Sequence, residues 1–217
     1  MKSKCMIFNS AATTIEKFLG MDVMKQIRYL GVTVDNKRNY FQQHKKQKIL
    51  QARRMTNLTY SVIARSCNKV LLGKTYWKSV VLPSILYASS VVTWTRKELE
   101  DLQRTDNQVW RQILGAPRYS QVVALPGEVG ASTSTSRDMK SKLNLANHMM
   151  MHSKNQLLSN VFEAMWEERR GEWVRQLERY LEEVRVKIYE LINMSKEKIK
   201  LKVHAWDQAR WRQELNI

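Results

Sequence analysis

Two short runs of apolar and β-branched side chains lie near the start of the chain, at residues 5–8 and 29–34. Asparagine, aspartate and glycine, which favour turns, bound these runs. The pattern predicts two strands joined by a longer loop. No other part of the sequence resembles sheet.

Helical spacing of apolar residues begins after Asn39, a residue type that often caps helices. Apolar side chains such as Ile49, Ala52 and Val62 then recur at steps of three and four. The pattern predicts one long helix over residues 40–65, and its charged side chains are all basic.

A proline and a capping motif divide the next segments. Residues 71–82 continue as a helix until Pro83, and residues 84–92 resume a helix after it. The sequence TRKE at residues 95–98 is a capping box. It predicts a helix that runs to Leu114 and ends at the Gly-Ala-Pro sequence beyond.

The segment 125–135 is rich in Gly, Ser and Thr, contains one proline and is the best linker candidate. Beyond it the pattern predicts only helix. One apolar stripe spans residues 173–191, with Glu183 and Lys187 as a favourable pair on the other face. The sequence thus predicts a mainly α protein with a small N-terminal β part and a C-terminal helical extension.

Charge is distributed unevenly along the 217 residues. The formal net charge is +17, of which +13 falls within residues 1–130. Residues 36–97 contain no Asp or Glu in 62 positions but include 13 Lys and Arg. Such a stretch would repel itself on an isolated surface, whereas a phosphate backbone would neutralise it and release condensed counterions. We therefore expect nucleic acid to be bound by Lys37, Arg38, Lys45, Lys46, Lys48, Arg53, Arg54, Arg65, Lys69, Lys74 and Lys78.

The composition disfavours secreted and membrane proteins. Cys5 and Cys67 are too few for a disulfide scaffold and lack any zinc-binding spacing, which indicates a reducing, intracellular compartment, nuclear or cytoplasmic. The N-terminal apolar stretch is too short for a signal peptide. The most apolar run, residues 80–94, is interrupted by Pro83 and several serines, so we expect no membrane partner.

Five segments, taken in order, resemble one protein family. Their order and spacing are similar to the end of the reverse transcriptase of a non-LTR (LINE-like) retrotransposon. The resemblance covers about residues 1–152 and includes His44 within the basic helix. The segments are KSKCMIFNS at 2–10, YLGVTVD at 29–35, WKSVVLPSILYASSVVTW at 77–94, LEDLQRTDNQVWRQILGAP at 99–117 and LPGEVG at 125–130.

The resemblance implies roles for particular segments. In that family the KSKxMxF segment ends the palm, and Lys2 matches its lysine near the active site. Tyr29, Leu30, Gly31 and Val32 are similar to the primer-grip hairpin, which positions the growing 3′ end. The helices that follow correspond to the thumb, which holds the template-primer duplex by shape and phosphate.

The same resemblance divides the chain into parts. We expect a palm-end and primer-grip-like β remnant at residues 1–35, followed by a basic, thumb-like multi-helix bundle at 36–124. A linker at 125–135 then leads to a C-terminal helical extension at 136–217.

The catalytic part of such a polymerase is missing from the sequence. These enzymes hold a pair of magnesium ions with two or three carboxylates, one of them in an aromatic-rich Ala-Asp-Asp turn. No such turn exists here, and neither Asp22 nor Asp35 lies in that context. We therefore expect a fragment with no catalytic residue, metal site or cofactor of its own, magnesium belonging to the parent family. Its expected partners are RNA, DNA or an RNA–DNA duplex, and the missing palm portion.

An alternative is a non-catalytic helical interaction protein, in which residues 155–215 pair with partner helices and the basic surface is incidental.

Several conspicuous side chains also have structural interpretations. Lys2 is expected to be solvated because the palm is missing, and His44 to pack near a helix start because no second metal ligand accompanies it. We expect core packing for Trp77, Trp94 and Trp110 and a solvated helix face for Glu182 and Glu183.

Overall fold

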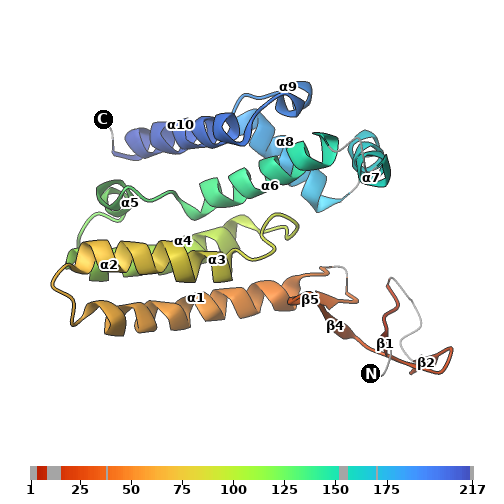
Figure 1. The fold of residues 1–217 in the computed structure, drawn as a ribbon, viewed down its shortest axis with the longest axis horizontal. Coiled ribbons are helices and arrows are strands. Elements are labelled where there is room, and N and C mark those ends of the chain that lie inside the picture. The colour runs from red at the N-terminus through yellow and green to blue at the C-terminus, as the bar shows by residue number, and fades with distance from the viewer. Residues whose placement is uncertain (1–3, 9–15, 38, 152–155, 170, 216–217) are drawn as a thin grey trace. The chain divides into compact units, whose positions relative to one another are not determined.

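The chain folds as two compact units, Met1–Gln51 and Ala52–Ile217. It is mainly helical with a few short N-terminal strands, as the sequence predicts (Figure 1). Helix α1 (Gln42–Ile63) contributes residues to both units. The computed structural model describes residues 4–8, 16–37, 39–151, 156–169 and 171–215.

The first unit contains two small sheets. In one sheet, β3 (Met21–Val23) lies between β1 (Lys4–Cys5), which is parallel to it, and β2 (Lys17–Phe18), which is antiparallel. In the other, β4 (Gln26–Tyr29) and β5 (Val32–Asp35) form an antiparallel hairpin. The prediction of only two strands missed β2 and β3, which are two and three residues long and too short for a visible alternation.

The hairpin corrects the prediction of one strand over residues 29–34. Leu30 and Gly31 have positive φ angles of 45° and 81°, so they form the two-residue turn between the paired residues Tyr29 and Val32. Turns of this kind match the right-handed twist of a hairpin, and glycine adopts positive φ at no steric cost. A single glycine within an apolar run was the sequence signal for this turn.

Helix α1 confirms the long basic helix predicted over residues 40–65. The carboxylate of Asp35, at the end of β5, accepts a hydrogen bond of 3.0 Å from the backbone N–H of Gln43. Asn39, the predicted N-cap, contributes its backbone carbonyl oxygen, which accepts from the N–H of Gln42 at 3.2 Å. A negative group at a helix N-terminus is favourable because it satisfies free amides and opposes the helix dipole.

Three short segments then form one continuous helical run: α2 (Lys69–Tyr76), the π-helical η1 (Trp77–Val81) and α3 (Leu82–Ile85). Pro83 lies in the first turn of α3 and does not end the helix as predicted. Proline lacks an N–H and crowds the preceding turn, and the wider π turn accommodates it.

The helix predicted over residues 84–92 is wrong, because α3 ends at Ile85. Residues 86–95 contain turns instead, and Ala88 there has a positive φ of 64°. The backbone leaves the helix so that this segment can bond to helices that come later in the chain.

Helix α4 (Arg96–Leu114) has both of the ends that the sequence predicts. The Oγ1 atom of Thr95 accepts from the N–H of Glu98 at 3.3 Å, and the Glu98 carboxylate accepts from the N–H of Thr95 at 2.8 Å. Gly115 ends the helix with a φ of 66°. This capping box and glycine C-cap are local signals, so the sequence alone defines the helix.

The three tryptophans predicted in the core are buried there. Trp77 and Trp110 meet edge to face, with 6.0 Å between ring centroids. Their contact joins η1 to α4, and Trp94 lies just before α4 with a buried side chain. Core packing is thus confirmed for all three.

The predicted linker over residues 125–135 contains helix α5 (Ala124–Val129), so a loop there is wrong over its first half. The ring of Trp211 lies so close to Gly127 that a Cβ atom at this position would come 2.3 Å from it. The indole N–H of Trp211 also donates to the carbonyl oxygen of Val123 at 2.7 Å. This contact comes from a helix far away in the sequence, so no local pattern indicates it.

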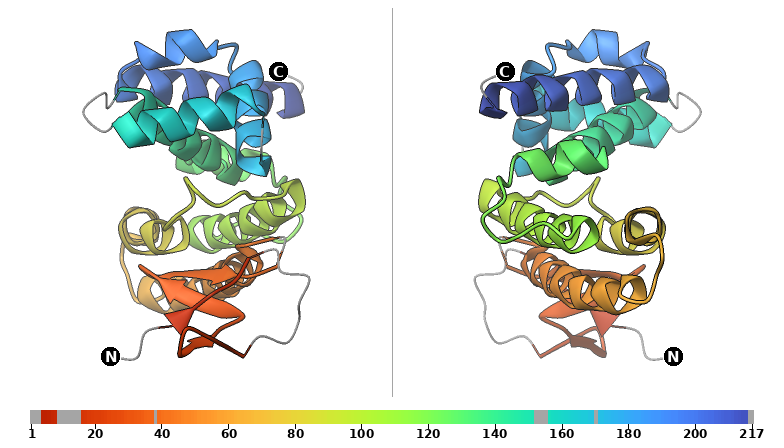
Figure 2. Two further views of the ribbon diagram at one scale, coloured as in Figure 1. Left: turned by 90° about the vertical axis from the view of Figure 1, so that its right-hand side faces the viewer. Right: turned by 90° about the vertical axis from the view of Figure 1, so that its left-hand side faces the viewer.

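The rest of the second unit is helical, as predicted. Helix α6 (Ser134–Met151) lies between α4 on one side and α8 (Glu172–Glu183) and α10 (Lys196–Leu215) on the other (Figures 1 and 2). Helices α7 (Gln156–Glu167) and α9 (Ile188–Ile192) also pack on α6. One hydrophobic core joins these helices and includes Met139, Leu143, Phe162, Leu177, Leu181, Leu191, Ile199 and Val203.

The apolar stripe predicted over residues 173–191 is divided between two helices. Helix α8 ends at Glu183, and Arg185 has a positive φ of 54° before α9 begins. The predicted i,i+4 pair of Glu183 with Lys187 is therefore wrong, because no helix connects them. The ammonium group of Lys187 lies instead 5.6 Å from the ring centroid of Tyr189. The solvated face predicted for Glu182 and Glu183 is confirmed, since both residues are exposed.

A charged network lies inside the second unit. The Nζ atom of Lys142 donates to the carboxylate of Asp138 at 2.6 Å and to the carbonyl oxygen of Val92 at 2.8 Å. The Tyr180 hydroxyl donates to the other carboxylate oxygen of Asp138 at 2.7 Å. Burial, together with the Asp138 charge, raises the pKa of Tyr180 far above its usual value. The network fixes the turn segment after α3 to α6 and α8.

Candidate nucleic-acid interface

The first unit holds five of the predicted phosphate-binding residues. Lys37 and Lys46 are exposed, and Lys48 is half-buried. Burial and the nearby charge of Arg28 lower the pKa of Lys48. The side chain of Lys45 is only 1% exposed, so it does not present its charge at the surface. Arg38 lies outside the described residues, as does Lys2, the lysine matched to the palm.

Burial separates Lys45 from Lys46 because the two side chains leave α1 about 100° apart. His44 is 1% exposed and lies on the buried side together with Lys45. His44 is thus packed near the start of α1, as predicted. The acid-free sequence alone could not distinguish the two lysines.

The four residues matched to a primer grip lie together at the tip of the β4–β5 hairpin. Tyr29 and Leu30 are 68% and 71% exposed, whereas Val32 is half-buried. Gly31 provides the turn between them. An apolar tip of this kind is unusual for a solvent-exposed turn, and its role as a primer grip stays a prediction.

The second unit presents four predicted residues on α1 and on its connection to α2. Arg53 and Arg54 are exposed on α1, and Arg65 and Lys69 are exposed around the following turn. Within the described part of the chain, none of the four forms an ion pair with an acidic side chain. We call these four residues the arginine-rich surface. Its positive charge is available to an anionic partner.

Lys74 and Lys78 belong to a different place in the second unit. The Nζ atom of Lys74 lies 3.7 Å from the position that a Cβ atom on Gly130 would take. Lys78 lines a cleft, and its pKa is lowered by partial burial and by the positive charges of Lys74 and Arg137. The structure therefore groups these two lysines with α6 and not with the arginine-rich surface.

The cleft has a volume of about 740 Å³ and lies among η1, the α5–α6 connection, α6 and α10. Lys140 of α6 and Lys200 and His204 of α10 line it together with Lys78. None of these three residues was predicted from the sequence. Lys200 and His204 are four positions apart, so they share one face of a helix. The packing of α6 against α10 that completes the cleft has no sequence signal.

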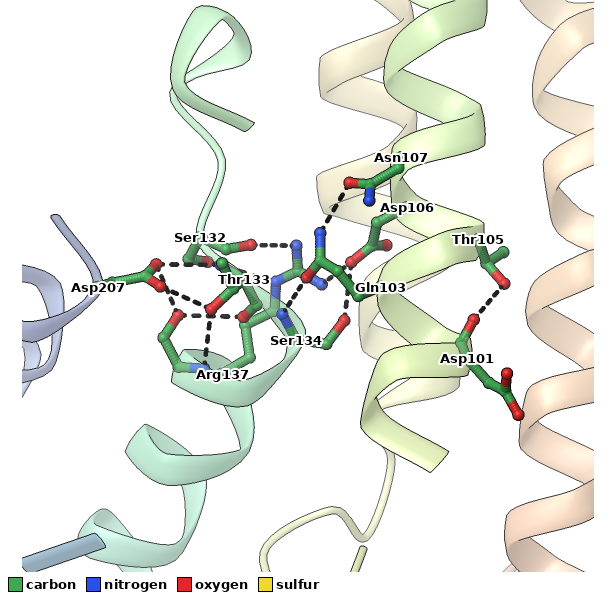
Figure 3. Close-up of polar contacts among 11 residues, drawn as sticks. Asp101, Gln103, Thr105, Asp106, Asn107, Ser132, Thr133, Ser134, Arg137 and Asp207 are labelled. Carbon is green, nitrogen blue, oxygen red and sulfur yellow. Dashed lines mark hydrogen bonds and ion pairs between the residues drawn. The ribbon is translucent and has the colours of Figure 1, made fainter. Parts of the chain in front are cut away.

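Polar contacts hold the walls of the cleft in place (Figure 3). Asp207 reaches from α10 to the start of α6, where its carboxylate accepts from the N–H and the Oγ1 of Thr133 at 3.0 and 2.6 Å. The Ser136 hydroxyl donates to the same carboxylate at 3.0 Å. Arg137 turns toward α4 and forms an ion pair of 2.6 Å with Asp106. The acidic group in the cleft is thus already hydrogen-bonded.

The described residues contain no group of three or more His, Cys, Asp or Glu side chains that could hold a metal ion. They also contain no helix that is both long and apolar enough to cross a membrane. Comparison of the chain with protein-family models, curated proteins and solved structures found no match.

Proposed function

We propose that this chain binds nucleic acid through the phosphate backbone, as the thumb segment of a LINE-like reverse transcriptase. The resemblance of its sequence segments to that family supports the assignment. In this proposal the ligand is RNA, DNA or an RNA–DNA duplex, held without reading its base sequence. Complete reverse transcription requires a palm with its magnesium-binding carboxylates, so the proposed activity of this chain is binding.

The arginine-rich surface is the observation that carries the proposal. Arg53, Arg54, Arg65 and Lys69 are exposed within a stretch of 62 residues that contains no acidic side chain. Guanidinium groups can bind a phosphate through two parallel hydrogen bonds. Within the described residues, no acidic side chain pairs with these four cations. Binding of a polyanion relieves the mutual repulsion of these charges.

The alternative, an interaction protein that pairs its C-terminal helices with partner helices, has less support from the fold. The apolar side chains of α8, α9 and α10 that could pair with a partner, such as Leu177, Leu191 and Ile199, are buried against α6. The apolar faces of these helices are thus largely covered within the unit, and Tyr189, Ile192 and Leu201 are their large apolar side chains that stay exposed. By contrast, the four residues of the arginine-rich surface form no ion pair within the described part of the chain.

A pair of variants with equal charge tests the proposal. The first replaces the four residues of the arginine-rich surface with glutamine. The control replaces four exposed basic residues of α10 with glutamine, namely Lys196, Lys198, Lys202 and Arg212. We expect the first variant to bind an RNA–DNA duplex at least about tenfold more weakly than the control, because both lose the same net charge but only the first loses phosphate contacts. Equal affinities in the two variants contradict the proposal.

A further inference from the structure

The cleft between α6 and α10 has the size of a small-molecule site. Its volume of about 740 Å³ falls within the range of about 300–1,000 Å³ that is usual for ligand pockets. It lies wholly within the second unit, and the arginine-rich surface contributes no residue to it. A ligand in this cleft therefore requires an explanation separate from binding along α1.

The charged side chains that line the cleft are mainly basic, so they favour an anionic ligand. Lys78, Lys140 and Lys200 line it, and none of them pairs with an acidic side chain in the part of the chain that the structure describes. Asp207 is the acidic residue among the lining side chains, and its carboxylate accepts three hydrogen bonds from Thr133 and Ser136. The start of α6 is thus already capped, and the three ammonium groups are available to a ligand.

The same cleft also has an aromatic wall. The indole of Trp211 forms part of the wall, fixed by its hydrogen bond to Val123 and by its contact with Gly127. A fixed aromatic ring offers a base a stacking surface whatever its identity. Ser141, Asn144 and Gln208 also line the cleft and offer hydrogen bonds.

We propose that this cleft binds one nucleotide unit, with its phosphate among Lys78, Lys140 and Lys200 and its base against Trp211. Lysine binds phosphate as a mobile point charge. Lysines from η1, α6 and α10 line this one cleft, so they offer cations to a phosphate group. The nucleotide comes from one of two sources, a free mononucleotide or one unpaired nucleotide of a strand bound by the protein.

Calorimetric titration of the full chain with adenosine 5′-monophosphate tests the site. The cleft variant is K140Q/K200Q, and its matched control is K196Q/K202Q, which removes the same charge from exposed positions of α10 outside the cleft. We expect the cleft variant to lose at least about tenfold in affinity and the control to keep wild-type affinity within about twofold. No binding to the wild type, or equal losses in both variants, overturns the proposal.

Two further ligands separate the parts of the nucleotide. Ribose 5-phosphate lacks the base and is expected to bind more weakly than the mononucleotide. Adenosine lacks the phosphate, so its affinity is expected to be the same for the wild type and for K140Q/K200Q. Equal binding of ribose 5-phosphate and mononucleotide contradicts the role of Trp211. It would mean that the cleft holds phosphate alone.

The source of the nucleotide is decided by competition with a single-stranded decathymidylate. If the strand displaces the mononucleotide and K140Q/K200Q weakens both ligands, the cleft takes an unpaired nucleotide of a strand. If the strand does not compete, the free mononucleotide is the ligand. The variant of the arginine-rich surface serves as a separate control, because it is expected to keep its mononucleotide affinity even if duplex binding is lost.

Discussion

The ammonium group of Lys142 lies 2.6 Å from the carboxylate of Asp138, and neither residue is exposed to solvent. The carboxylate also accepts from Ser89 and Tyr180, and the ammonium group also donates to carbonyl oxygens after α3. A buried ion pair is tolerated when further hydrogen bonds satisfy both groups, as they do here. This pair joins α6 to the irregular segment that precedes α4.

Replacing Asp138 with alanine should destabilise the protein strongly. The change leaves the Lys142 charge buried without its carboxylate, which costs about 3–5 kcal/mol of unfolding free energy. Urea unfolding followed by circular dichroism measures this loss. The control is Asp101→Ala, which removes a surface pair with Arg104, whose side chain is 73% exposed against 22% for Asp101, and should cost less than about 1 kcal/mol. Similar losses in the two variants contradict the role of the buried pair.

The stability difference between the wild type and Tyr180→Phe should depend on pH. The pKa of Tyr180 is raised in the folded protein, so the folded state keeps the hydroxyl proton at a pH where the unfolded chain releases it. Its contribution is fully present below the unfolded pKa of about 10 and declines as the pH rises above it. Unfolding free energies at pH 7, 9 and 10.5 should show the wild-type advantage shrinking only at the highest pH. A difference that grows with pH contradicts this coupling.

Replacing Thr95 with alanine should remove one half of the capping box at the start of α4. The Thr95 hydroxyl accepts from the N–H of Glu98, and loss of such a cap costs about 1 kcal/mol. Thermal unfolding measures the change. Thr75→Ala, at an exposed position inside α2, is the control and should be neutral or slightly stabilising, because alanine has the higher helix propensity. An equal loss of stability in the control would mean that the effect of Thr95→Ala is not specific to the cap, which contradicts this prediction.

The purified chain should not extend a primer on any template. The sequence lacks the Ala-Asp-Asp turn whose carboxylates hold the two magnesium ions of a reverse transcriptase. A primer-extension assay with magnesium and deoxynucleotides checks this expectation. Incorporation that a carboxylate substitution within this chain abolishes would contradict the assignment to the thumb part.

Local signals predicted the elements that depend on local contacts. The capping box at Thr95 and the glycine at 115 define α4 within the sequence itself, and the spacing of apolar residues is enough for α1. The three core tryptophans were also predictable, because each lies among apolar neighbours. In these cases the residues that determine the structure lie within one or two helical turns of it.

The errors arose where distant residues decide the structure. Helix α5 forms under Trp211, which is 84 positions beyond Gly127, and the turn segment after α3 is fixed by Asp138 and Lys142. The burial of Lys45 and the placement of Lys78, Lys140 and Lys200 around one cleft likewise depend on tertiary packing. A charge pattern therefore indicates a basic protein, but it does not say which of its cations share a surface.

The dependence of binding on salt tests the central claim most directly. Affinity for an RNA–DNA duplex is measured over a range of salt concentrations for the wild type and for the variant with Arg53, Arg54, Arg65 and Lys69 replaced by glutamine. If about three of these residues contact phosphates, the slope of log affinity against log salt should become shallower by roughly 2 to 3 units, since each contact releases about 0.9 counterion. The α10 control with four glutamines should keep the wild-type slope. An unchanged slope in the first variant, with an unchanged circular dichroism spectrum, would contradict the proposal that the arginine-rich surface binds nucleic acid.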